Sequence, residues 1–182
     1  MHRCDTGCYA NAPLFKSINT ESNMSEQQQP VFRIEKIYVK DLSLEIPNAP
    51  GVFLEREAPQ VDVQLHTVGE RIDEGMYEAL LTATITAKIN DKTMFLVEVR
   101  QAGIFQIRNV AEAEMEPVLG IACPNILFPY LREAVSDIVT RAGFPPVILN
   151  PVNFEVIYQQ DKQRADLNTV ATGSLDEAKQ TH

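Results

Sequence analysis

Three stretches between positions 60 and 107 alternate nonpolar and polar residues, and this period of two constrains the fold more than any other feature of the sequence. The stretches read QVDVQLHTV, MYEALLTATITAKI and MFLVEVRQAGIFQI. Successive side chains of a β-strand point to opposite faces, so each stretch predicts a strand with one buried and one solvated face. The polar residues NDKT join the last two stretches, which predicts a long hairpin of residues 76–89 and 93–107.

A fourth strand is expected upstream, at residues 31–44, where β-branched and aromatic residues are frequent. Pro47 and Pro50 then mark a loop that precedes the alternating stretches. Beyond residue 110 the nonpolar residues follow the spacing of a helix instead. Four strands followed by two helices predict an α+β fold with a four-stranded antiparallel sheet.

Prolines and a glycine punctuate the first helical region, which begins with AEAEMEP at residue 111. Gly120 is a weak point for a helix. Pro124 suits the first turn of a new helical segment, and Pro129 predicts a kink or an irregular turn. The segment is expected to end at Gly143.

A second helix is expected from the sequence NPVNFEVIYQQ, which begins at residue 150. Asn150 is a suitable N-cap because its side-chain oxygen can accept hydrogen bonds from the first free backbone amides. Pro151 would then be the first helical residue, where its missing N–H costs nothing.

One folded domain is expected, at residues 31–160. Residues 1–30 are polar and without a hydrophobic period, which predicts a disordered segment. Met24 begins MSEQQQP, which looks like a natural translation start, so residues 1–23 are either native or an addition to the natural chain. Residues 161–182 are expected to form a flexible polar tail.

Charge and hydropathy narrow the compartment and the partners. The chain carries 16 Lys and Arg against 25 Asp and Glu, a net charge of -9, which disfavours nucleic acids and anionic membranes. No stretch approaches the roughly 20 nonpolar residues that span a bilayer, and the N-terminus lacks the nonpolar segment of a signal peptide. A cytoplasmic protein without membrane insertion is therefore expected.

Catalytic motifs are not recognisable. The sequence contains neither a glycine-rich phosphate loop nor a Gly-x-Ser-x-Gly turn, and its three histidines, His2, His66 and His182, have no evident catalytic partner. Cys4 and Cys8 are either weak metal-ligand candidates or bystanders. We expect no enzymatic activity, no catalytic residue, no metal and no cofactor.

An excess of nonpolar residues is the most informative feature of the C-terminal third. The connection GFPPVILNP is strongly nonpolar, whereas loops normally run over the surface and stay polar. Such a loop beside a nonpolar helix predicts a subunit interface or a groove for nonpolar ligands. The alternative is that these side chains complete a small core.

Three segments carry a resemblance to a known family: IYVKDLSLEIPNAP, CPNILFPYLRE and FPPVILNPVNF, in this order. From Met24 to Tyr158 the chain resembles the SecB protein-export chaperones. The resemblance implies a homotetramer arranged as a dimer of dimers, with helices between two eight-stranded sheets. It also implies an ATP-independent chaperone that binds unfolded secretory precursor proteins in the cytoplasm and delivers them to the SecA motor ATPase.

The resemblance also implies two binding surfaces. The positions that match the family's acidic SecA-binding patch are Asp41, Glu45, Leu96 and Glu98, and the alternative for them is a solvated acidic face. The candidates for a groove that holds unfolded clients are Val61, Val63, Leu65, Phe128, Tyr130, Phe144, Phe154 and Tyr158, and for each of them the alternative is the core.

Two other functions stay open at this point. A chaperone of the same fold might serve another client, such as a toxin–antitoxin pair, which would not need the acidic patch. A small-molecule enzyme would need a compact polar pocket instead.

Overall fold

The computed structural model describes residues 29–164 of the chain. The expectations for residues 1–28, including His2, Cys4, Cys8 and the status of residues 1–23, lie outside this range. The same holds for His182 and for most of the expected C-terminal tail, residues 165–182.

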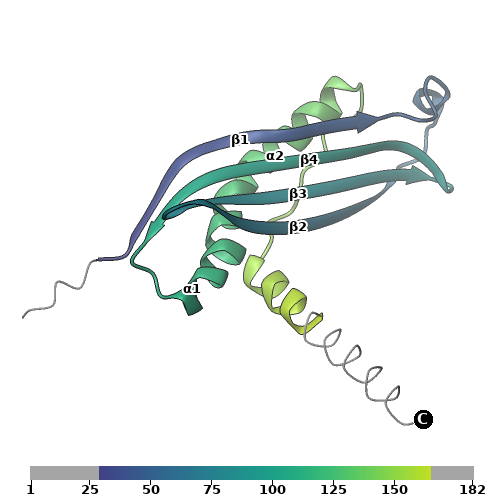
Figure 1. The fold of residues 1–182 in the computed structure, drawn as a ribbon. Helices are drawn as coiled ribbons and strands as arrows, with labels where there is room; N and C mark the ends of the chain where they lie inside the picture. Colours follow the sequence, from purple (N-terminus) through teal and green to yellow (C-terminus); the bar gives the residue numbers. More distant parts are fainter. Residues whose placement is uncertain (1–28, 165–182) are drawn as a thin grey trace, which may run out of the picture.

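Four antiparallel strands form one sheet, as the sequence predicts (Figure 1). They are β1 (Val31–Glu45), β2 (Gln60–Asp73), β3 (Met76–Ile89) and β4 (Lys92–Arg108). Their order across the sheet is β1-β4-β3-β2, so the first two strands of the chain lie at opposite edges. The loop of residues 46–59 therefore crosses from one edge to the other, and we call it the crossover loop.

The predicted hairpin consists of β3 and β4. Asn90 and Asp91 form its turn with φ angles of 46° and 63°. Asn and Asp tolerate this left-handed conformation better than other non-glycine residues, and two such residues match the twist of the flanking strands. The turn chemistry and the alternation agree, which is why this element is readable from the sequence.

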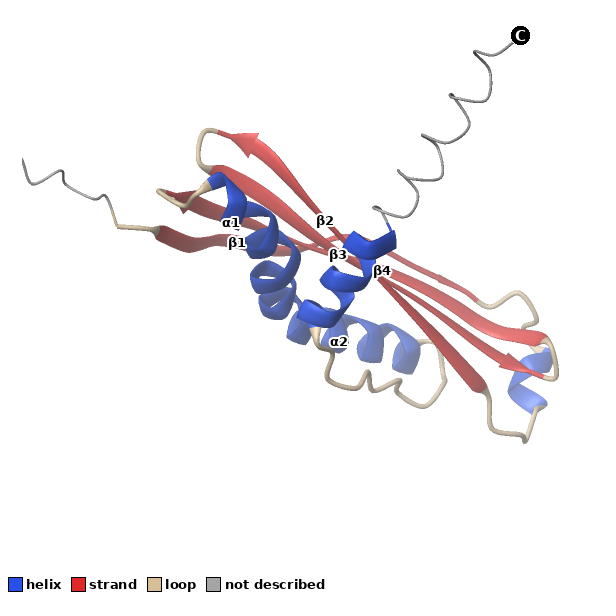
Figure 2. Cartoon of the chain, turned by 90° about the horizontal axis from the view of Figure 1, so that it is seen from below, coloured by secondary structure: helices blue, strands red, loops and turns tan. Residues whose placement is uncertain are grey.

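Helices cover one face of the sheet and leave the other face open (Figure 2). They are α1 (Glu112–Pro117), the π-helical segment η2 (Val118–Ala122) and α2 (Cys123–Arg141). A further helix at residues 154–164, which we call the C-terminal helix, follows an extended connection. Leu127, Leu131 and Val135 of α2 are fully buried in one core together with Val97 and Val99 of β4.

The irregular turn expected at Pro129 lies earlier, in η2, and α2 is assigned as helix through Pro129. The backbone N–H of Cys123 donates to the carbonyl of Val118, five residues before it. Pro124 explains this wider turn, because its ring clashes with the carbonyl four residues upstream. Pro129 is tolerated because the carbonyl that it leaves without an amide partner belongs to Asn125, an exposed residue that water can reach.

The predicted cap of the second helix is wrong by three positions. Residues 150–153 are not helical, and the side-chain oxygen of Asn153 accepts hydrogen bonds from the amides of Glu155 and Val156 at 3.0 and 3.3 Å. Both Asn150 and Asn153 are competent caps. A helix that starts after Asn153 places Phe154 in the core at 1% exposure, so burial selects the later start.

Candidate functional site

A groove of about 1000 Å³ lies on the helix-covered side of the molecule. The crossover loop, β2, the tip of the β3–β4 hairpin, the connection after α2 and the C-terminal helix all contribute to its walls. Most of the lining side chains are nonpolar, and Glu55, Glu57, Asp161 and Arg164 add charges.

The floor of the groove follows from the strand register. Val61 of β2 lies opposite Ala87 of β3, which lies opposite Phe95 of β4. The small side chain of Ala87 leaves room between its two larger neighbours, and all three nonpolar side chains face the helices. Val63 and Leu65 continue the same face along β2, because alternate residues of a strand share a face.

Three phenylalanine rings make one end of the groove aromatic. Phe53 of the crossover loop stacks on Phe144 with 5.0 Å between ring centroids, and Phe144 lies 4.9 Å from Phe95. Phe95 and Phe144 are 3% and 7% exposed, whereas Phe53 is 48% exposed. The crossover loop thus lays an accessible ring over two buried ones, an offset arrangement that aromatic pairs favour.

Five of the eight predicted groove residues line this groove: Val61, Val63, Leu65, Phe128 and Phe144. The structure places the other three elsewhere. Phe154 is buried and supports Phe128 from below, with ring centroids 5.7 Å apart. Tyr130 is an exposed residue of α2, and Tyr158 packs beside Gly120.

The sequence reasoning missed Phe53, Met94 and Phe95 as lining residues. Phe95 carried a signal, because it falls on the nonpolar face of an alternating strand. Phe53 carried none, because it follows Pro47 and Pro50 in a segment that reads only as a loop. Its position depends on the long path of the crossover loop across the end of the sheet.

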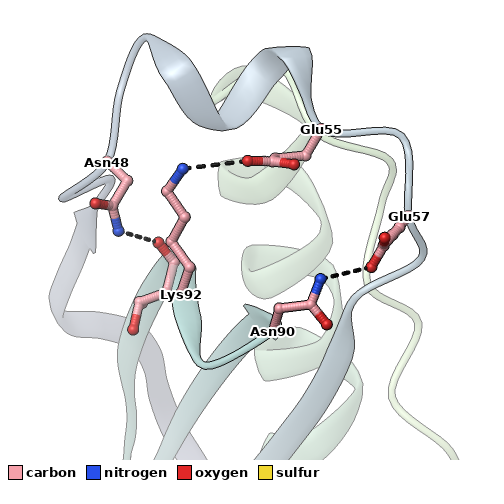
Figure 3. Close-up of polar contacts among 6 residues, drawn as sticks. Asn48, Glu55, Glu57, Asn90 and Lys92 are labelled. Atoms are coloured by element: carbon pink, nitrogen blue, oxygen red, sulfur yellow. Dashed lines mark hydrogen bonds and ion pairs between the residues drawn. The ribbon is translucent and has the colours of Figure 1, made fainter.

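Polar contacts fasten the crossover loop to the tip of the hairpin (Figure 3). The side-chain amide of Asn48 donates to the carbonyl of Thr93 at 2.8 Å. Lys92 pairs with Glu55 at 3.1 Å. Asn90 donates to Glu57 at 2.8 Å. We call these three contacts the clasp.

The open face of the sheet brings the four predicted acidic-patch positions together. Glu45 of β1 lies opposite Leu96 of β4, and the next residues on this face are Ser43 and Glu98, which also lie opposite each other. Asp41 follows, opposite Arg100. The acidic residues therefore form a compact patch across two neighbouring strands, and Arg100, which the sequence did not single out, bounds it with a positive charge.

A second polar cluster crosses the same sheet. The phenol of Tyr38 donates to Glu78, and Lys40 pairs with the other oxygen of that carboxylate at 2.6 Å. The hydrogen bond to Glu78, together with burial, raises the pKa of Tyr38 to about 12. Burial alone would raise the pKa of Glu78, but hydrogen bonds from Lys40 and Tyr38 and the charges of Lys40 and Arg100 hold it below its ordinary value.

Reactive groups are sparse within residues 29–164. Burial raises the pKa of Cys123 to about 12, so this thiol is protonated and unreactive near neutral pH. No group of three or more His, Cys, Asp or Glu side chains in this range is placed to hold a metal ion. None of its helices is long and nonpolar enough to cross a membrane.

The sheet with helices on one face, an open nonpolar groove and an acidic patch defines an α+β protein built for binding. The family model described as preprotein translocase subunit SecB matches residues 25–165. The protein-export protein SecB of Nitrosospira multiformis is 69% identical over 157 residues, which cover 86% of this chain and 98% of that protein. The corresponding protein of Nitrosomonas eutropha is 68% identical over 141 residues, which cover 76% and 88%. The chain belongs to the SecB family.

A solved structure shares the fold. The SecB-like chaperone of Mycobacterium tuberculosis, in complex with a peptide from an antitoxin, superposes with a TM-score of 0.56 at 15% identity, over 67% of this chain and 91% of that one. The four-stranded antiparallel sheet followed by helices is therefore the SecB-like architecture. The family is one of protein-export chaperones and not of enzymes.

Proposed function

We propose that this protein is an ATP-independent export chaperone that holds unfolded secretory precursor proteins in the groove and delivers them to the SecA motor ATPase. It acts in the cytoplasm as a homotetramer arranged as a dimer of dimers. The observation that carries the proposal is the open nonpolar groove in a chain whose 61–69% identical relatives are protein-export proteins. Those relatives also favour export precursors over a toxin–antitoxin client.

The chemistry of the groove suits a chain that has not folded. Unfolded proteins expose nonpolar side chains, and each Å² removed from water stabilises the complex by about 25 cal/mol. Val61, Val63 and Phe53 offer exposed nonpolar surface for such contacts. Because several grooves of one oligomer would hold one long client, modest contacts at each groove add up to tight binding.

The acidic patch supports delivery to SecA. Asp41, Glu45 and Glu98 present negative charge beside Leu96 on the open face, away from the groove. A basic segment of the motor would find complementary charge there, which speeds encounter and weakens with salt. Because groove and patch lie on different faces, client and motor would bind at the same time.

The edge of β1 supports assembly. Phe32, Ile34 and Val39 are between 43% and 48% exposed on this edge strand. A long edge strand with exposed nonpolar side chains tends to pair with another chain. A second copy of β1 would extend the sheet and cover these side chains.

Two measurements test the proposal. The purified protein should delay the refolding of an unrelated denatured protein when no nucleotide is present, and its mass under native conditions should correspond to four chains. Undelayed refolding at one tetramer per substrate would contradict the chaperone activity. A monomeric mass would contradict the assembly and remove the multivalent surface.

A further inference from the structure

The crossover loop both walls the groove and covers part of its aromatic end. Phe53 lies on Phe144, and Phe144 in turn lies on Phe95. Phe144 and Phe95 are almost fully buried in this arrangement, whereas half of the Phe53 ring is exposed. Moving the loop would therefore uncover two aromatic rings that are continuous with the groove.

Little else holds this loop. Gly51–Leu54 form the short 3-10 helix η1, in which only Val52 is buried. Outside the ring stack, the attachment consists of the clasp, which joins Asn48, Glu55 and Glu57 of the loop to the hairpin tip (Figure 3). The members of the clasp's ion pair, Lys92 and Glu55, have side chains that are 45% and 37% exposed. Such an exposed pair contributes little and is screened by salt.

We propose that the crossover loop is a gate on the client groove: the clasp keeps it closed with Phe53 seated on Phe144, and an incoming client displaces Phe53 and binds Phe144 and Phe95. This inference rests on the proposed function, because it assigns a regulation to the same groove. The exchange is balanced, since one nonpolar contact with Phe144 replaces another. Weak polar contacts therefore suffice to set the balance between the closed and open loop.

Charge exchange at the ion pair tests the gate. In the full-length protein, Lys92→Glu places two like charges together and should open the loop. We expect amide hydrogen exchange in residues 52–55 to become about two- to fivefold faster. Binding of reduced and carboxymethylated lysozyme, a chain that cannot refold, should become faster by a similar factor. The double variant Glu55→Lys with Lys92→Glu restores the pair and should return both rates to the wild-type values.

Lys88→Glu is the matched control, because it makes the same charge change on β3, and no ion pair of Lys88 is present among the described residues. It should leave both rates unchanged. Unchanged amide exchange in Lys92→Glu would overturn the clasp, and faster exchange with unchanged client binding would overturn the gate. Both results leave the proposed function standing, whereas a wild-type protein that does not bind the unfolded chain refutes the function itself.

Discussion

The phenol of Tyr38 on β1 donates a hydrogen bond to the carboxylate of Glu78 on β3, so the two side chains meet over the intervening strand β4. Lys40 reaches the same carboxylate. The three side chains join one edge strand to the centre of the sheet on its open face. This contact links residues 40 positions apart in the chain and makes the stability of the sheet depend on pH.

Tyr38 predicts a loss of stability at high pH. Because the folded protein raises its pKa from 10 to about 12, the phenol contributes stability that is complete below pH 10 and is lost as the pH rises toward 12. Urea unfolding of the wild type and of Tyr38→Phe should show this loss between these pH values in the wild type only. Equal slopes against pH in the two proteins would contradict the contact.

Glu78 predicts the opposite dependence. Its pKa is lowered on folding, so the carboxylate stabilises the folded state above its ordinary value of 4.5, and this contribution is lost as the pH falls below that value. Glu78→Gln should therefore be less stable than the wild type at neutral pH and should approach it in acid. A constant difference in the midpoint of urea unfolding would show that the charge has no such role.

The two faces of β2 predict different effects on client binding. Val63 lines the groove and Val68 does not, although their side chains are 40% and 45% exposed. Val63→Asp puts a charge where the client buries nonpolar surface and should weaken retention of an unfolded chain roughly tenfold, about 1.4 kcal/mol. Val68→Asp is the matched control and should bind as the wild type does. Equal losses in the two variants would rule out the groove as the binding surface.

The acidic patch predicts a charge-dependent contact with SecA. Glu98→Lys reverses the central charge of the patch and should abolish co-purification with SecA, because like charges oppose the encounter. Glu70→Lys makes the same change at an exposed position of β2, outside the patch, and should retain it. Retention by both variants, or an interaction that does not weaken with salt, would place the SecA contact elsewhere.

The helix cap predicts a difference between two asparagines. Asn153 accepts two amide hydrogen bonds at the start of the C-terminal helix, so Asn153→Ala should lower the free energy of unfolding by about 1 kcal/mol. Asn150→Ala, at the position that the sequence favours as the cap, should be nearly neutral. Thermal unfolding of the two variants distinguishes these outcomes, and a larger effect at Asn150 would contradict the observed helix start.

Two sorts of information separate in this protein. The alternation in residues 76–89 and 93–107 and the Asn90–Asp91 turn are local, so the sequence alone determined the hairpin and its two faces. Local spacing also placed Asp41 and Glu45 on one side of their strand. Family resemblance, carried by segments such as CPNILFPYLRE, added the expected partners.

Tertiary structure decided what depends on distant contacts. Only the pairing of β1 with β4, and not with its neighbour β2, sets Glu45 beside Leu96. Only packing chose Asn153 over Asn150, because the burial of Phe154 outweighs a choice between two equally good caps. The position of Phe53 on Phe144 likewise needs a loop to cross the whole sheet. Local patterns specify which face a side chain takes, but the free energy of burial is shared among segments far apart in sequence, and so the groove exists only in the folded chain.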